Sequence, residues 1–120
     1  MRSEYYGSVR VTYFEKERVW TAVRELASEL SDKHPEITKI AVFGSLVRDE
    51  AAPGSDVDVL LVLDHSDAPF TARPGLYRPA KFPVGLDIFA YTAREAAEML
   101  AGGNQFLRTA FAEAKVLFER

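Results

Sequence analysis

The chain has 120 residues, of which 48% are hydrophobic and 28% are charged, and its formal net charge is −3. This length predicts one globular domain with its own core, and the acidic balance argues against a general nucleic-acid-binding protein. The sequence contains no cysteine, which excludes a disulfide framework, a thiol nucleophile and any metal site built on thiolates.

The first third of the chain predicts one helix followed by one strand. Residues 1–13 are ambiguous, because their alternating apolar residues suit a short strand and the segment suits a loose N-terminal arm equally well. From residue 14 to about residue 30, apolar residues recur at steps of three and four, as on one face of an amphipathic helix. A proline soon afterwards ends that helix, and the apolar segment 37–43 predicts a strand.

The rest of the chain predicts three further strands and two helices. The segment 57–63 is apolar on both faces after its first aspartate, which predicts a central strand covered on both sides. Four prolines within residues 64–83 predict a loop or a short irregular helix. The last predicted elements are a strand over 84–91, a helix over 93–101 that opens with a capping box, a helix from 104 to about 114, and a strand over 115–119. In the helix from 104, Asn104 is the expected cap and Phe106 is expected on the inner face. Together these elements predict an α/β (α+β) fold in which helices pack against a small mixed β-sheet.

The chain also lacks membrane and export signals. The first residues do not form the apolar core of a secretion signal, and no segment approaches the roughly 20 apolar residues that span a bilayer. We therefore expect a soluble, cytoplasmic protein that does not contact a membrane.

Three aspartates carry the strongest functional signal. Asp56 and Asp58 are two residues apart, so a strand points both side chains to one face. Two like charges about 4 Å apart repel by roughly 4 kcal/mol at an effective dielectric constant of 20, which indicates that a cation lies between them. Mg²⁺ suits the position because it binds through a few carboxylates and substrate phosphates. Asp87 lies inside the predicted strand 84–91, and it would complete a three-carboxylate cage if that strand pairs with 57–63.

A second group of residues suits phosphate binding. Gly44 and Ser45 follow the first predicted strand. Glycine lets a phosphate approach the backbone closely, and N–H groups at a helix N-terminus favour anionic oxygens. Arg48, one turn later, is placed to neutralise phosphate charge.

Each of these residues also has a purely structural interpretation. The two aspartates of the pair suit a turn and a strand cap, and Asp87 suits an edge strand facing solvent. The Gly-Ser dipeptide suits a simple strand-to-helix turn. Arg48 suits a solvated position or a salt bridge to Asp49 or Glu50.

In this order, Gly44-Ser45, Arg48 and the Asp56/Asp58 pair, followed by a later strand aspartate, resemble the signature of the DNA polymerase beta nucleotidyltransferase superfamily. The resemblance spans residues 37–91 and is strongest to the minimal nucleotidyltransferase branch. It implies a single nucleotidyltransferase domain over residues 1–120. It also implies that Asp56 and Asp58 ligate two Mg²⁺ ions, that Asp87 ligates the catalytic one, and that Gly44 and Ser45 bind the β- and γ-phosphates. The family often reads Gly-Ser-x-Ala-Arg-Gly, whereas Val47 and Asp49 stand here in place of the alanine and the last glycine.

The resemblance implies Mg²⁺-dependent transfer of a nucleoside monophosphate from a nucleoside triphosphate, preferably ATP, to a hydroxyl acceptor. We expect the acceptor on a partner chain or at a self-association surface, because the chain has little length left to enclose a small one. The branch implies a HEPN-type toxin as that partner, and an antitoxin role. The mixed basic and aromatic loop 73–82 is our candidate docking surface. Two alternatives remain: a small-molecule acceptor such as an aminoglycoside, and a non-catalytic module that senses nucleotide or binds a partner, for which Asp49 is the best support.

Overall fold

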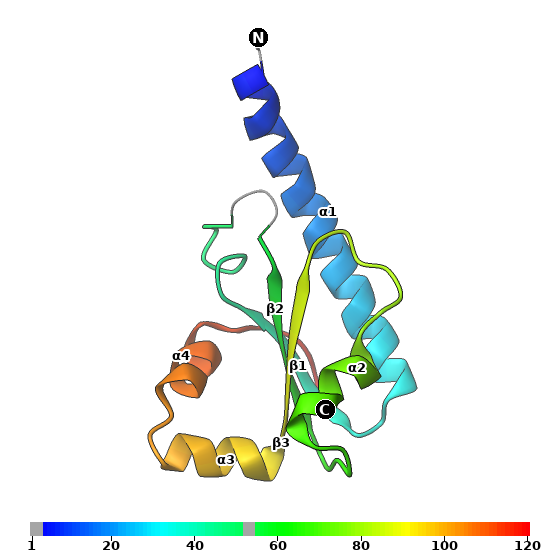
Figure 1. Ribbon diagram of the computed structural model, residues 1–120, viewed down its shortest axis with the longest axis vertical. Helices are drawn as coiled ribbons and strands as arrows, with labels where there is room; N and C mark the ends of the chain where they lie inside the picture. The colour runs from blue at the N-terminus through cyan, green and yellow to red at the C-terminus, as the bar shows by residue number, and fades with distance from the viewer. Residues whose placement is uncertain (1–3, 52–54) are drawn as a thin grey trace.

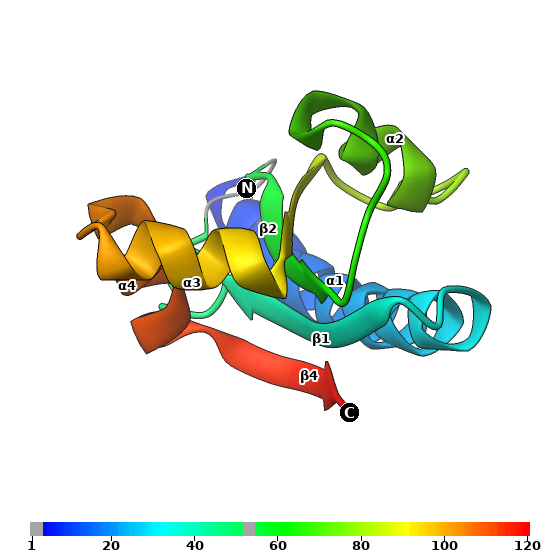
Figure 2. The same cartoon turned by 90° about the horizontal axis from the view of Figure 1, so that it is seen from below.

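The computed structural model describes residues 4–51 and 55–120. Its centre is a mixed four-stranded sheet with strand order β3-β2-β1-β4, and helices cover both faces (Figure 1). The strands are β1 (Ile37–Phe43), β2 (Val57–Leu63), β3 (Leu86–Thr92) and β4 (Lys115–Glu119). Strand β1 is antiparallel to both β2 and β4, whereas β2 and β3 are parallel. In the view of Figure 2, β4 lies at the outer edge of the sheet, next to the C-terminus. The predicted fold class, a small mixed sheet with packed helices, is confirmed.

Helix α1 (Glu4–Lys33) begins earlier than the sequence indicated. Residues 4–13 are helical, so neither the short strand nor the loose arm expected there is found, and residues 1–3 lie outside the described part of the chain. The physical reason is cooperativity: once the amphipathic segment has formed a helix, adding a turn requires no new nucleation. The start of α1 projects beyond the sheet (Figure 1). The end of the helix is where the sequence predicts it.

The core has two layers because β2 alternates between them. Val59 and Leu61 belong to the layer that α1 covers, and Leu60 belongs to the layer that contains residues of α3 and α4. All three side chains are at most 1% exposed. The prediction that 57–63 is a central strand covered on both faces is therefore confirmed.

The two C-terminal helices begin with the caps that the sequence predicts. Helix α3 (Ala93–Ala101) opens with a capping box in which Thr92 and Glu95 exchange side-chain and backbone hydrogen bonds. Helix α4 (Gln105–Glu113) opens with Asn104, whose side chain accepts from the Leu107 N–H at 2.9 Å. Phe106 was expected on the inner face of this helix, but it is 45% exposed.

The segment between β2 and β3 contains the short helices η1 (Phe70–Ala72) and α2 (Arg73–Tyr77) within a loop, as the prolines indicated. The predicted docking surface over residues 73–82 is wrong for Arg73 and Tyr77, which are buried. Arg73 is 4% exposed and Tyr77 is 3% exposed. Their polar atoms are bound internally, because Arg73 pairs with Glu95 and the Tyr77 hydroxyl donates to Glu36 at 2.8 Å.

Within residues 4–51 and 55–120, no helix combines the length and the apolar character that a bilayer-spanning segment requires.

Candidate active site

The carboxylates meet where β2 and β3 begin. The parallel register pairs Asp58 directly with Asp87, so the two side chains are cross-strand neighbours on one face of the sheet. Asp56 precedes Asp58 by two residues, and both aspartates of this pair interact electrostatically with each other. In Figure 1 the starts of β2 and β3 lie side by side. Asp56 and Asp87 are exposed, and Asp58 is half-buried between them and the loop after β1.

Two glycines leave the room that these carboxylates occupy. Gly44 has a φ of +85°, and a Cβ atom there would lie 2.5 Å from Oδ2 of Asp58. A Cβ atom at Gly85 would overlap Oδ1 of Asp56. Asp58 thus lies against the backbone of the Gly-Ser loop, and Asp56 lies against the residue that leads into β3. Gly85 was not among the predicted site residues, although a glycine two positions before a strand aspartate is a sign of close approach.

The electrostatic state of the site favours a cation. Burial raises the pKa of the Asp58 carboxyl, and the charges of Asp87 and Asp56 raise it further, while Arg48 acts in the opposite direction. The fold therefore holds a carboxylate where its charge is disfavoured. A hard divalent cation would remove that penalty by replacing repulsion with attraction to oxygen ligands.

The three aspartates fit a divalent metal by their chemistry and shared face. Among residues 4–51 and 55–120, however, no three His, Asp or Glu side chains are already arranged around a metal position. The Asp56 carboxylate lies against Gly85, and the Asp58 carboxylate lies against Gly44.

The Gly-Ser loop differs from the expected helix start. The residues after Gly44 form turns, in which the N–H groups of Val47 and Arg48 both donate to the Gly44 carbonyl, at 3.1 and 3.2 Å. A helix dipole therefore does not favour a phosphate at this loop. The groups available to bind a phosphate are the backbone N–H groups of the loop and the Arg48 guanidinium.

Glu113, the last residue of α4, joins this loop and was missed by the sequence analysis. The Gly44 N–H donates to its Oε2 at 3.0 Å, and Nη1 of Arg48 donates to both carboxylate oxygens, at 2.7 and 3.0 Å. Arg48 also pairs with Glu50 at 2.8 Å, which is one of the structural partners expected for it. No sequence signal marks Glu113, because it lies more than sixty positions from both partners and α4 shows no motif at its C-terminal end.

Asp49 takes the conformation that explains the glycine of the family pattern. Its φ is +61°, in the left-handed region where glycine is unstrained and aspartate is among the better-tolerated residues. Its carboxylate pairs with the Lys16 ammonium of α1. The extra negative charge at this position is therefore matched by a cation. Val47, the other departure from the pattern, packs against the core.

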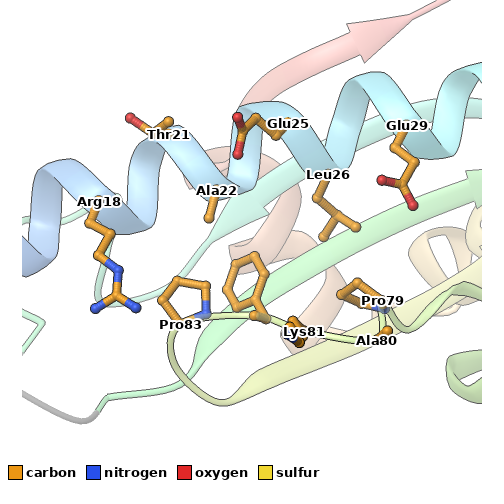
Figure 3. Close-up of a pocket in the computed structure, with 11 residues that line it drawn as sticks. Arg18, Thr21, Ala22, Glu25, Leu26, Glu29, Pro79, Ala80, Lys81 and Pro83 are labelled. Carbon is orange, nitrogen blue, oxygen red and sulfur yellow. The ribbon is translucent and has the colours of Figure 1, made fainter.

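A groove of about 870 Å³ runs between α1 and the loop 79–83 (Figure 3). It lies on the face of the sheet that α1 covers, whereas the aspartates share the face of Leu60. Its acidic residues, Glu25 and Glu29, are exposed on a helix surface. The candidate active site is therefore the carboxylate cluster and not this groove.

A sequence model of the family described as nucleotidyltransferase domain matches residues 23–108, which is more than half of the chain. The chain belongs to this family. The matched segment contains all six residues predicted for the site, and Glu113 lies outside it. A nucleotidyltransferase domain is a transferase domain that acts on nucleotides; the minimal branch stays a prediction.

Six chains among solved structures are also similar to this nucleotidyltransferase domain. One is the crystal structure of a proposed nucleotidyltransferase from Sulfolobus solfataricus, with a TM-score of 0.61 and 16% sequence identity. The alignment covers 88% of this chain and 84% of that chain, and at this identity it shows the fold alone. No curated protein matches the chain by sequence.

Proposed function

We propose that the chain transfers a nucleoside monophosphate from ATP to a hydroxyl group, in a reaction that depends on Mg²⁺ and releases pyrophosphate. The observation that carries this proposal is the direct pairing of Asp58 with Asp87 in the register of β2 and β3, with Asp56 beside them. A family domain match and a glycine loop against the same carboxylates support it.

The residues of the chain have separate roles in this reaction. Gly44, Ser45 and Arg48 bind the β- and γ-phosphates, which orients the α-phosphorus toward the acceptor. Asp56, Asp58 and Asp87 would hold Mg²⁺, which when bound neutralises phosphate charge. The acceptor oxygen forms a bond to the α-phosphorus as the bond to the pyrophosphate oxygen breaks. The acceptor proton passes to Asp87, whose side chain is exposed and so open to an acceptor.

The acceptor we propose is a tyrosine hydroxyl on a partner protein, a HEPN-type toxin, which makes this chain its antitoxin in the cytoplasm. Asp56 and Asp87 are exposed, and an open site suits an acceptor that brings its own surface and orienting contacts. The net charge of −3 disfavours a nucleic-acid 3′ end, which would need a basic track. Because Arg73 and Tyr77 are internal, this acceptor no longer depends on the loop 73–82 as a docking surface.

The test is to incubate the chain with labelled ATP, Mg²⁺ and the protein encoded beside it, and to locate the label by mass spectrometry. We expect label on a partner tyrosine, and a loss of at least about a hundredfold in Asp58→Asn, the scale on which one preorganised electrostatic group acts. Glu119→Gln is the matched control, because it removes one carboxylate from β4, where Glu119 pairs with Lys39. Label on small aminoglycosides alone would replace the acceptor, and release of pyrophosphate by Asp58→Asn at the wild-type rate would contradict the site.

A further inference from the structure

The Glu113 carboxylate occupies the position that a phosphate group needs. A phosphate bound at the Gly-Ser loop requires a backbone N–H donor and a cation, and the groups available are the Gly44 N–H and Arg48. Glu113 already accepts from both, with donor–acceptor distances of 2.7 to 3.0 Å. The guanidinium and the amide N–H donate hydrogen bonds to the two oxygens of one planar anion. The edge of a phosphate would accept hydrogen bonds in the same arrangement.

The fold does not need this contact for its stability. The Arg48 side chain is 47% exposed, so water can solvate it when Glu113, which is 19% exposed, leaves. Arg48 also keeps a second carboxylate, Glu50. An ion pair whose arginine is this exposed contributes little to the free energy of unfolding.

The contact also places a further negative charge beside the aspartates. Glu113 is among the charges that raise the pKa of Asp58. A triphosphate and the Glu113 carboxylate cannot both occupy the space at the Gly44 N–H. Each is an anion, and each would accept a hydrogen bond from that same N–H group. One must displace the other.

We propose that Glu113 is an intramolecular occupant of the triphosphate position, which holds Gly44 and Arg48 while nucleotide is absent and is displaced when nucleotide binds. The inference rests on the proposed function, because it assigns the nucleotide's phosphates to the Gly-Ser loop. Glu113 thereby sets nucleotide affinity: each binding event must break its bonds to Arg48 and Gly44. The pairing also keeps the loop's donors oriented in the empty site.

The test compares nucleotide affinity in wild type, Glu113→Gln and Glu119→Gln. Isothermal titration with a non-hydrolysable ATP analogue and Mg²⁺ should show about threefold to tenfold tighter binding in Glu113→Gln, since a neutral amide competes less well for Arg48. Glu119→Gln removes the same charge at a distance, so it should change the affinity by less than about twofold. Inorganic tripolyphosphate, titrated in the same way, should show the same order of affinities, because the competition concerns phosphates and not the base.

A second readout follows the loop itself. In ¹⁵N-labelled protein, the Gly44 amide signal should shift on Glu113→Gln, and adding nucleotide to wild type should move it away from its Glu113-bound position. Circular dichroism confirms that each variant is folded.

The outcomes separate the two proposals. Equal or weaker nucleotide binding by folded Glu113→Gln, with Asp58-dependent transfer intact, would overturn the role of Glu113 and leave the proposed function standing. Failure of wild type and of every variant to bind either the nucleotide or tripolyphosphate would overturn both.

Discussion

Arg73–Glu95 and Arg48–Glu113 are both arginine–glutamate ion pairs, but their surroundings differ. The Arg73 side chain is 5% exposed, and its guanidinium contacts both Glu95 oxygens, at 2.6 and 3.0 Å, and the carbonyls of Ala68 and Ala90. Arg48 is 47% exposed, and the carboxylates of Glu50 and Glu113 share its guanidinium.

The two ion pairs differ in what surrounds them. Glu95 also closes the capping box of α3, so its pair with Arg73 ties the segment before β3 to the helix after β3. The other groups that Arg73 contacts are backbone carbonyls, those of Ala68 and Ala90. The groups around Arg48 and Glu113 are instead a glycine loop and a half-buried aspartate. We therefore expect the first pair to stabilise the structure, and we assign the second to the proposed binding site.

The largest expected effect is the loss of stability in Glu95→Gln. Removing one partner of a buried pair costs about 3–5 kcal/mol, because the other charge stays buried. The Glu95 side chain is 39% exposed, so we expect about 2–3 kcal/mol here. Urea unfolding measures it. Glu113→Gln is the matched variant and should lose about 0.5 kcal/mol or less. Equal losses in the two variants would show that burial of the arginine does not distinguish the two pairs.

The pH dependence of the same pair sharpens the contrast. The hydrogen bond from Arg73, aided by the Thr92 N–H, lowers the pKa of Glu95 from 4.5 to about 2. A lowered pKa means that this stabilisation is complete above about pH 4.5 and is lost as the pH falls through about 2. The difference in unfolding free energy between wild type and Glu95→Gln should therefore shrink across that range. Urea titrations from pH 6 to pH 2 would show this, and a difference that stays constant would mean that ionised Glu95 is not what Arg73 requires.

A smaller effect is expected at Asp58. Like charges on directly paired residues of neighbouring strands destabilise a sheet, and Asp58 lies opposite Asp87. Asp58→Asn should therefore stabilise the metal-free chain, by up to about 1 kcal/mol. Thermal unfolding in EDTA measures this change. Adding Mg²⁺ with an ATP analogue should stabilise wild type and leave Asp58→Asn nearly unchanged; the same gain in both would remove Asp58 from the metal site.

The smallest effect is expected for Asp49→Gly, because the pair of Asp49 with Lys16 is a surface interaction. Asp49→Gly should change the free energy of unfolding by about 0.5 kcal/mol or less, because relief of the φ of +61° offsets the lost pair. Asp49→Val, which adds a branched Cβ at the same φ, should cost about 1–2 kcal/mol. If glycine costs as much as valine, the Lys16 pair is a structural interaction comparable to Arg73–Glu95.

The local patterns of the sequence predicted most of the fold. The strand 57–63, the capping box at Thr92 and the cap at Asn104 were each predicted, because a few neighbouring residues determine them. Residues 4–13 were missed because helix propagation depends on the helix that follows, and not on their own short alternation.

In the candidate site too, features that local sequence determines could be predicted, and features that depend on distant segments could not. The pairing of Asp58 with Asp87 follows from the adjacency of β2 and β3, which could be predicted from the sequence only as a condition. Glu113 and the burial of Arg73 depend on contacts between distant segments, and no spacing within α4 or the loop encodes them.

The proposed carboxylate site is tested most directly by locating where a divalent metal and a nucleotide bind. Mn²⁺ can be titrated, with a non-hydrolysable ATP analogue, into ¹⁵N-labelled chain while paramagnetic broadening of the amide signals is followed. We predict broadening centred on Asp58, Asp87 and the Gly44 loop, and its loss in Asp58→Asn. Broadening centred on the groove beside α1, or unchanged in Asp58→Asn, would contradict the account.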